Sequence, residues 1–228
     1  MIKQFHIDPS FSVYELTRRS MQDTAVMHHR KTMTVISNEI ENATIVDDVK
    51  NTVFSSFQRM SRFLPQAGRY RELAAKSEHV YVFGVVDCDL PTIDNLTYVP
   101  LKPTDQLAKE WFCVSHGRDY FTALATEELS DIDDPDHLRE FKGVWSFDAF
   151  MVELLYDWLA RIVDLKQMPV RERNYLKQAE LISNTIGRMA VRVMDHQDDD
   201  PVTYDELQSI MQSSLHPAHN HIKDVARR

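Results

Sequence analysis

Cys113 and His116 come closest, by type and spacing, to a catalytic pair. A cysteine three residues before a histidine, where a strand gives way to a turn, would let an imidazole activate a thiolate nucleophile. The alternation of the strand argues against this, because a cysteine between Phe112 and Val114 usually packs in the core. A small hydrolase or transferase with a Glu110, Cys113 and His116 pocket is therefore our alternative hypothesis, and it requires the three side chains to meet in one solvent-reachable cleft.

Metal and nucleotide sites have little support in the sequence. His216, His219 and His221 are potential zinc ligands, but Pro217 interrupts them and no fourth ligand is apparent. The five glycines are scattered singly, whereas a Walker loop or a dinucleotide fingerprint needs clustered glycines to close on phosphates. We therefore expect no metal and no cofactor.

The composition narrows the class of protein. The chain has 228 residues, 43% of them hydrophobic, which is enough for one domain with an appendage or for two small domains. A net charge of −9 argues against coating nucleic acid. Neither a signal-peptide core nor an apolar run of the ~18 residues that span a membrane is present. We expect a cytoplasmic protein that binds neither nucleic acid nor membrane; a DNA-binding regulator using the basic residues His28 to Lys31 is a weaker alternative.

The elements that would position functional side chains centre on residues 52–87. Val53, Phe54 and Phe57 form a short β-prone run, and residues 80–86 form a nearly continuous apolar run typical of a strand buried on both faces. Strong helix formers fill residues 69–76 between them. This order predicts a right-handed βαβ unit with a parallel pair of strands at the centre of the fold.

The rest of the chain predicts a mixed α/β sheet flanked by helices. Strands are expected at 96–101, 110–114, 120–125 and 141–147, and a turn at 115–119 should make an antiparallel hairpin beside the parallel pair. Helices are expected at 9–22 with Asp8 as N-cap, at 28–41, as a single turn at 106–109, and after Asp148. The last of these carries an apolar stripe of Met151, Leu155, Trp158, Ile162 and Leu165.

A long helix is predicted near the end of the chain, from about 169 to 196. Its apolar residues recur in steps of four and three, the spacing of a coiled-coil seam: Tyr175, Ala179, Ile182, Ile186, Met189 and Val193. This seam is a candidate interface with a second copy or a partner, although packing onto its own domain is equally compatible. The chain then divides into an N-terminal helix at 1–24, an α/β domain at 25–166 and a C-terminal helical extension at 167–228.

Six segments between about residues 25 and 165 combine into a family pattern: KTMTVISNEIE (31–41), FSSFQ (54–58), RYRELAA (69–75), HVYVFG (79–84), EWFCV (110–114) and FKGVWSFD (141–148). In this order and spacing they resemble the DICT sensory domain, named for diguanylate cyclases and two-component systems. The resemblance implies a regulatory input domain of the type common in cyanobacterial signalling proteins, with a suspected part in light response. It implies no catalytic residues. We find no kinase or cyclase motif and expect action through a partner.

The positions within those segments that could bind a ligand or partner are polar or aromatic: Gln58, Arg69, Tyr70, Glu110, Trp111, Trp145 and Asp148. At strand ends and on the crossover helix they would converge at the carboxyl edge of the parallel strands, where open α/β sheets bind ligands. Alternatively, Arg69 bridges to an acid, the tryptophans are core residues, and Asp148 only caps its helix.

Our leading hypothesis is thus a non-enzymatic signalling protein. Its α/β core would sense a small molecule or a protein, and its C-terminal helices would form a homodimer or dock a histidine kinase, response regulator or cyclase.

Overall fold

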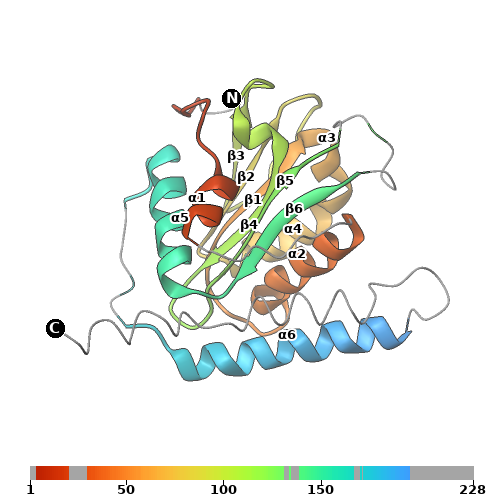
Figure 1. Ribbon diagram of the computed structural model, residues 1–228, viewed down its shortest axis with the longest axis vertical. Helices are drawn as coiled ribbons and strands as arrows, with labels where there is room; N and C mark the ends of the chain where they lie inside the picture. Colours follow the sequence, from red (N-terminus) through yellow and green to blue (C-terminus); the bar gives the residue numbers. More distant parts are fainter. Residues whose placement is uncertain are drawn as a thin grey trace.

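A six-stranded mixed sheet forms the centre of the protein in the computed structural model (Figure 1). The structure describes residues 4–20, 30–130, 134, 139–166, 170 and 172–195. The strand order is β3-β2-β1-β4-β5-β6, with helices on both faces. The predicted fold class, a mixed α/β sheet with flanking helices and a C-terminal helix, is confirmed.

The predicted βαβ unit is the middle of this sheet. β1 (Thr52–Arg59) pairs in parallel with β2 (His79–Val85), and the crossover carries α3 (Met60–Phe63), the 3₁₀ turn η1 (Leu64–Gln66) and α4 (Ala67–Lys76). β3 (Leu96–Leu101) extends the parallel part beside β2. The apolar runs form these strands because both faces of the sheet are covered, so successive side chains alternate between two buried cores.

The antiparallel half is added at the other edge of β1. The 3₁₀ turn η2 (Gln106–Lys109) leads into β4 (Glu110–His116), which pairs with β1, and β5 (Thr122–Glu128) and β6 (Phe141–Ser146) follow. The hairpin was predicted correctly, but β5 begins two residues later than expected and runs three residues further. Its extension to Glu128 brings that residue to the edge where β1 ends and β4 begins.

Each face of the sheet has its own helical layer. α1 (Val13–Ser20) and α5 (Ala149–Ile162) cover one face, where they pack on Phe54, Phe83 and Phe112. α2 (Arg30–Ile45) and α4 cover the other face, over a core that includes Val53 and Val82.

Helix α1 starts later than the sequence indicated. Asp8 accepts a hydrogen bond from the Ser10 amide, and Phe11 N donates to Asp8 O, so this segment is a turn. Ser12 caps the helix instead, since its hydroxyl accepts from Glu15 N at 2.8 Å. Pro9 is compatible with a turn as well as with the first position of a helix, so the sequence did not distinguish the two.

Asp148 caps α5 as predicted, accepting from Met151 N at 2.8 Å. The predicted stripe on α5 is only partly the buried one: Met151 and Leu155 are in the core, whereas Trp158 is 42% exposed and stacks on Phe11. More residues of α5 are buried than the predicted stripe contains, because the helix lies against the broad surface of the sheet.

Helix α6 (Tyr175–Asp195) packs against α2 and is drawn in blue at the bottom of Figure 1. It begins near Asn174, which caps it by accepting from Lys177 N, rather than at Pro169. Its buried residues are Gln178, Leu181, Thr185 and Met189. Of the predicted seam, Met189 is buried, Ile182 and Ile186 are half-buried, Tyr175 and Ala179 are exposed, and the side chain of Val193 lies outside the described residues.

Candidate functional site

A cavity of about 280 Å³ lies between α2 and the sheet, beside the end of β1. Its floor is buried and mostly polar: Ser55, Ser56, Gln58, Tyr70, Cys113, Glu41 and Arg139. Its rim is half-exposed and includes Arg30, Thr34, Phe57, Arg62, Gln66 and Trp111. Small-molecule sites usually measure about 300–1,000 Å³ and are lined mainly by apolar side chains, so this cavity is small and unusually polar by comparison.

Gln58 is part of this floor and has a strained conformation. β1 carries a bulge between Ser56 and Arg59: these residues are three positions apart in β1, whereas their partners Phe83 and Val85 are two positions apart in β2. Gln58 lies within the bulge and has a φ of 62°. Non-glycine residues in this region cost of order 1–3 kcal/mol and gather at functional sites. The bulge turns the Gln58 side chain into the cavity, where it is 2% exposed.

The side-chain amide of Gln58 joins two arginines and an acid. Its Nε2 donates to Glu128 Oε2 at 2.6 Å, and its Oε1 accepts from Arg62 Nη1 at 2.8 Å and from Arg139 Nη2 at 2.6 Å. Arg139 also donates twice to Glu128. Because these groups come from β1, α3, β5 and the residues just before β6, the network fixes the end of the cavity next to Arg62 and Arg139.

The other end of the floor contains a buried acid, Glu41 on α2. Arg69 and Tyr70 on α4 both donate to its carboxylate, the tyrosine at 2.8 Å. Burial raises the pKa of Glu41, while the Arg69 and Tyr70 contacts oppose the rise. Burial likewise raises the pKa of Tyr70, and Glu41 beside it adds to the rise, so the hydroxyl keeps its proton and acts as a donor. Arg69 therefore bridges to an acid, as the alternative interpretation had it.

Trp111 forms part of the rim. Its Nε1 donates to Ser37 Oγ at 3.1 Å, and its ring meets Phe141 edge-to-face. The indole thus ties β4 to α2 and lines the cavity.

Of the seven predicted site residues, the structure brings Gln58, Tyr70 and Trp111 to the cavity, and Arg69 contacts its Glu41. The other three lie elsewhere: Glu110 under α1, Trp145 in the core with its Nε1 donating to Thr122 Oγ1, and Asp148 at the start of α5.

Glu110 has a structural task on the opposite face of the sheet. Its carboxyl accepts from Ser12 Oγ at 2.5 Å and from the amides of Val13 and Tyr14, so it holds the first turn of α1. Burial raises its pKa to about 7, although the three hydrogen bonds act to lower it.

The alternative hydrolase site does not assemble. Cys113 is buried on the α2 face of the sheet, and burial raises the pKa of its thiol, which disfavours a thiolate. His116 lies on the α5 face, stacked on Tyr156 at 3.7 Å and hydrogen-bonded to Glu153. Glu110 is at the far end of β4, about 20 Å from His116 at a strand rise of ~3.3 Å per residue. Strand alternation places Cys113 on the opposite face from Glu110 and His116, and the length of β4 separates those two.

Apart from Arg30, sequence reasoning missed the charged residues in and beside the cavity: Glu41, Arg62, Arg139 and, bonded to Gln58, Glu128. Glu41 fell within a segment of the family pattern, and that was its one signal. Arg62 and Arg139 sit in a crossover and a loop without a local motif. The basic stretch 28–31 had been considered as a DNA contact; His28 and His29 lie outside the described residues, and Arg30 lines the cavity.

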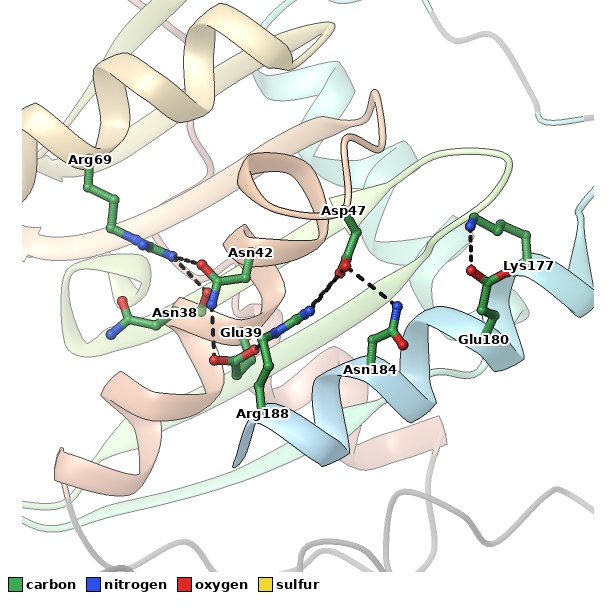
Figure 2. A network of polar contacts seen from close by, with 9 residues as sticks. All are labelled: Asn38, Glu39, Asn42, Asp47, Arg69, Lys177, Glu180, Asn184 and Arg188. Atoms are coloured by element: carbon green, nitrogen blue, oxygen red, sulfur yellow. Dashed lines mark hydrogen bonds and ion pairs between the residues drawn. The ribbon is translucent and has the colours of Figure 1, made fainter. Parts of the chain in front are cut away.

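A chain of polar contacts leads from the cavity floor to α6 (Figure 2). Arg69 donates to Asn42 Oδ1 at 2.9 Å, and Asn42 Nδ2 donates to Glu39 Oε1 at 3.0 Å. Glu39 is fully buried and accepts from Arg188 Nε at 2.6 Å. Arg188 also pairs with Asp47 at 3.0 Å. Helix α2 thus borders the cavity and carries Glu39, and the turn after it carries Asp47, the two acids that pair with Arg188 of α6.

Among the residues that the structure describes, no group of three or more His, Cys, Asp or Glu is placed to hold a metal ion. The histidines at 216, 219 and 221 lie outside that part. No described helix is long and apolar enough to span a bilayer.

The structure is of the mixed α/β class, with a small polar cavity between α2 and the sheet. The family model of DICT, a sensory domain in diguanylate cyclases and two-component systems, matches residues 10–129. The chain therefore belongs to the DICT family and is a sensory protein of signal transduction. The match begins and ends earlier than the resemblance at 25–165.

No curated protein matches the chain. Among solved structures, the crystal structure of polyphosphate kinase from Porphyromonas gingivalis is similar over 78% of this chain and 31% of that one, with 17% identity and a TM-score of 0.40. The chain spans about a third of the length of that kinase. A likeness at this level carries no argument about activity.

Proposed function

We propose that the cavity under α2 is the sensory site, that it binds a small molecule, and that the protein acts without catalysing a reaction. The observation that carries this is Gln58: a buried amide in a left-handed bulge, bonded to three charged side chains at the cavity floor. Strain at a bulge beside a cavity is typical of a binding site. A purely structural strand end would have no reason to keep it.

The same helix that borders the cavity supplies the output. A ligand that displaces α2 by a fraction of an ångström also shifts Glu39 and Asp47, which hold Arg188 of α6. The outer face of α6 has exposed apolar residues, among them Tyr175 at 64% and Leu176 at 85% exposure. We propose that this face contacts a second copy of the chain or a cytoplasmic histidine kinase, response regulator or cyclase, and that the signal belongs to a light response.

The binding claim is tested by purifying the intact protein from cells under native conditions and extracting it for small-molecule mass spectrometry. Cells grown in light and in darkness provide the two samples. The expected result is one compound at near-equal molar ratio in wild type and its loss in a Ser55→Phe variant, which fills the floor. Equal recovery from both proteins would place the compound elsewhere and remove the sensory role of the cavity.

The output claim is tested by light scattering coupled to size-exclusion chromatography, and by capture of signalling proteins on the immobilised chain. Leu176→Gln combined with Ala179→Gln should halve the mass if the protein dimerises through α6, or abolish capture if a partner binds there. The control is Glu180→Gln, another exposed α6 residue. Unchanged mass and unchanged capture in the double variant would refute the role of this face.

A further inference from the structure

A cluster of titratable groups lies where β4 ends, on the face of the sheet opposite the cavity. His116 is 4% exposed, and its ring stacks on Tyr156 of α5 with the centroids 3.7 Å apart. Its Nε2 lies 3.0 Å from Glu153 Oε2 and 3.2 Å from Arg173 Nη2, and Arg173 also pairs directly with Glu153. One imidazole nitrogen is thus placed between a carboxylate and a guanidinium.

Arg173 connects this cluster to the start of α6. Its Nη1 donates to Gly117 O at 2.9 Å, and its guanidinium lies over the Phe121 ring, 4.4 Å from the centroid. The next residue, Asn174, caps α6 and donates its own amide to Arg118 O at 3.0 Å. The contacts of Arg173 therefore help to hold the first turn of α6 on the turn between β4 and β5.

The proton on His116 decides how well these contacts are satisfied. A neutral imidazole has one nitrogen without a hydrogen, so Nε2 is able to accept from Arg173. In the imidazolium both nitrogens are donors, so Nε2 only donates to Glu153, and two cations then compete for one carboxylate oxygen. Protonation thus removes the hydrogen bond from Arg173 to His116 and weakens the pairing of Arg173 with Glu153.

The surroundings of His116 set the direction of the effect. Glu153, Tyr156 and Asp157 face it from α5, Arg173 faces it from the segment before α6, and β1 places the uncharged Thr52 beside it. Burial lowers the pKa of His116 and the Arg173 charge adds to this, whereas the two acids act to raise it.

This lowered pKa means that the folded protein takes up the proton less readily than the unfolded chain. The contribution of the cluster to stability is therefore complete above the ordinary histidine pKa of 6.5 and is lost as the pH falls below it. Because Glu153 is 28% exposed, protons from the solvent reach the cluster.

We propose that His116 is a pH-sensitive latch: when its imidazole takes up a proton, Arg173 leaves its place beside His116 and Glu153, and the first turn of α6 is released from the turn between β4 and β5. The latch makes the attachment of α6 respond to the pH of the surrounding solution, independently of what the cavity binds.

The test is hydrogen exchange on the intact protein at about pH 7.5 and about pH 5, values on either side of the histidine titration. The rates are expressed as protection factors, which removes the intrinsic pH dependence of exchange. Protection of residues 175–182 should fall several-fold at the lower pH relative to β1 and β2, which serve as the internal reference. Unchanged relative protection of this segment at the two pH values would overturn the proposal.

Two histidine variants locate the effect. His116→Gln has an uncharged side chain at both pH values, so the fall in protection should be missing. His79→Gln is the matched control, because His79 is also partly buried with a pKa lowered by burial, but is bonded to Asn95 and Thr97 beside β3. A fall that persists in His116→Gln, or disappears in His79→Gln, would assign the pH response to another group and refute the latch.

The coupling to Arg173 has its own measurement, an NMR titration of the His116 imidazole resonances. In Arg173→Gln the pKa of His116 should be higher than in wild type, because the neighbouring positive charge is gone. An identical pKa in the two proteins would contradict the competition for Glu153. Failure of the latch in these experiments leaves the sensory cavity and its own test unaffected.

Discussion

Replacing Arg188 by alanine should loosen α6 from the rest of the protein. The guanidinium is the charged partner of Glu39, whose side chain is fully buried, and it also pairs with Asp47. Removing one partner of a buried ion pair leaves an unpaired charge and typically costs 3–5 kcal/mol. Since the Arg188 side chain keeps 24% exposure, so that water can reach the vacated place, we expect about 3 kcal/mol.

Urea denaturation of wild type and variant gives the free energy of unfolding, and hydrogen exchange shows where the loss appears. Adding Glu39→Gln to the Arg188→Ala variant removes the stranded charge and should restore about 1–2 kcal/mol. Lys177→Ala is the matched control: Lys177 pairs with Glu180 on the exposed side of the same helix, so stability should hardly change (Figure 2).

A loss below 1 kcal/mol for Arg188→Ala, or no recovery in the double variant, would contradict this reasoning. Either result would mean that the Glu39 carboxylate does not depend on Arg188, because water or Asn42 satisfies it. Helix α6 would then be attached to α2 by apolar contacts.

Three further outcomes are expected. Because burial raises the pKa of Glu110 from 4.5 to about 7, the folded state binds a proton that the unfolded state has lost, and stability should fall by about 2–3 kcal/mol from pH 5 to pH 8. In Glu110→Gln the free energy of unfolding, measured by urea denaturation, should lack this decrease between pH 5 and pH 8. The same pH dependence in wild type and variant would refute the prediction. Gln58→Gly and Gln58→Ala both lose the cavity amide, but the glycine variant should be about 1 kcal/mol more stable in thermal denaturation because φ at this position is 62°. Equal melting temperatures of the two variants would show that the backbone there is not strained. Tyr70→Phe should cost about 1–3 kcal/mol by taking a donor from buried Glu41, and an unchanged melting temperature would count against that hydrogen bond.

The sheet was predictable because its signals are local. Residues 80–86 form a nearly continuous apolar run, and the helix formers before them favour a right-handed crossover between two parallel strands. The cap at Asp148 was equally local, since the hydrogen bond to Met151 spans three residues. The start of α6 was misplaced because Pro169 gave a plausible helix start, whereas the Asn174 cap carries no more signal than any loop asparagine.

The cavity was not predictable because its parts meet only in three dimensions. Arg139 reaches Gln58 across 81 residues, and Arg188 reaches Glu39 across 149. The bulge at Gln58 has no glycine to mark it. Glu110 was assigned to the site as a polar position within a segment of the family pattern, but strand alternation places it and Trp111 on opposite faces of the sheet.

The central claim is that a ligand bound in the cavity changes the stability of α6. Hydrogen exchange on the intact protein, with and without the compound recovered from native cells, tests it directly. Amides of residues 175–195 should exchange at a several-fold different rate with the compound bound, and the difference should vanish in Arg188→Ala, which still binds it. Binding of the compound in the cavity with unaltered exchange in α6 would contradict the account.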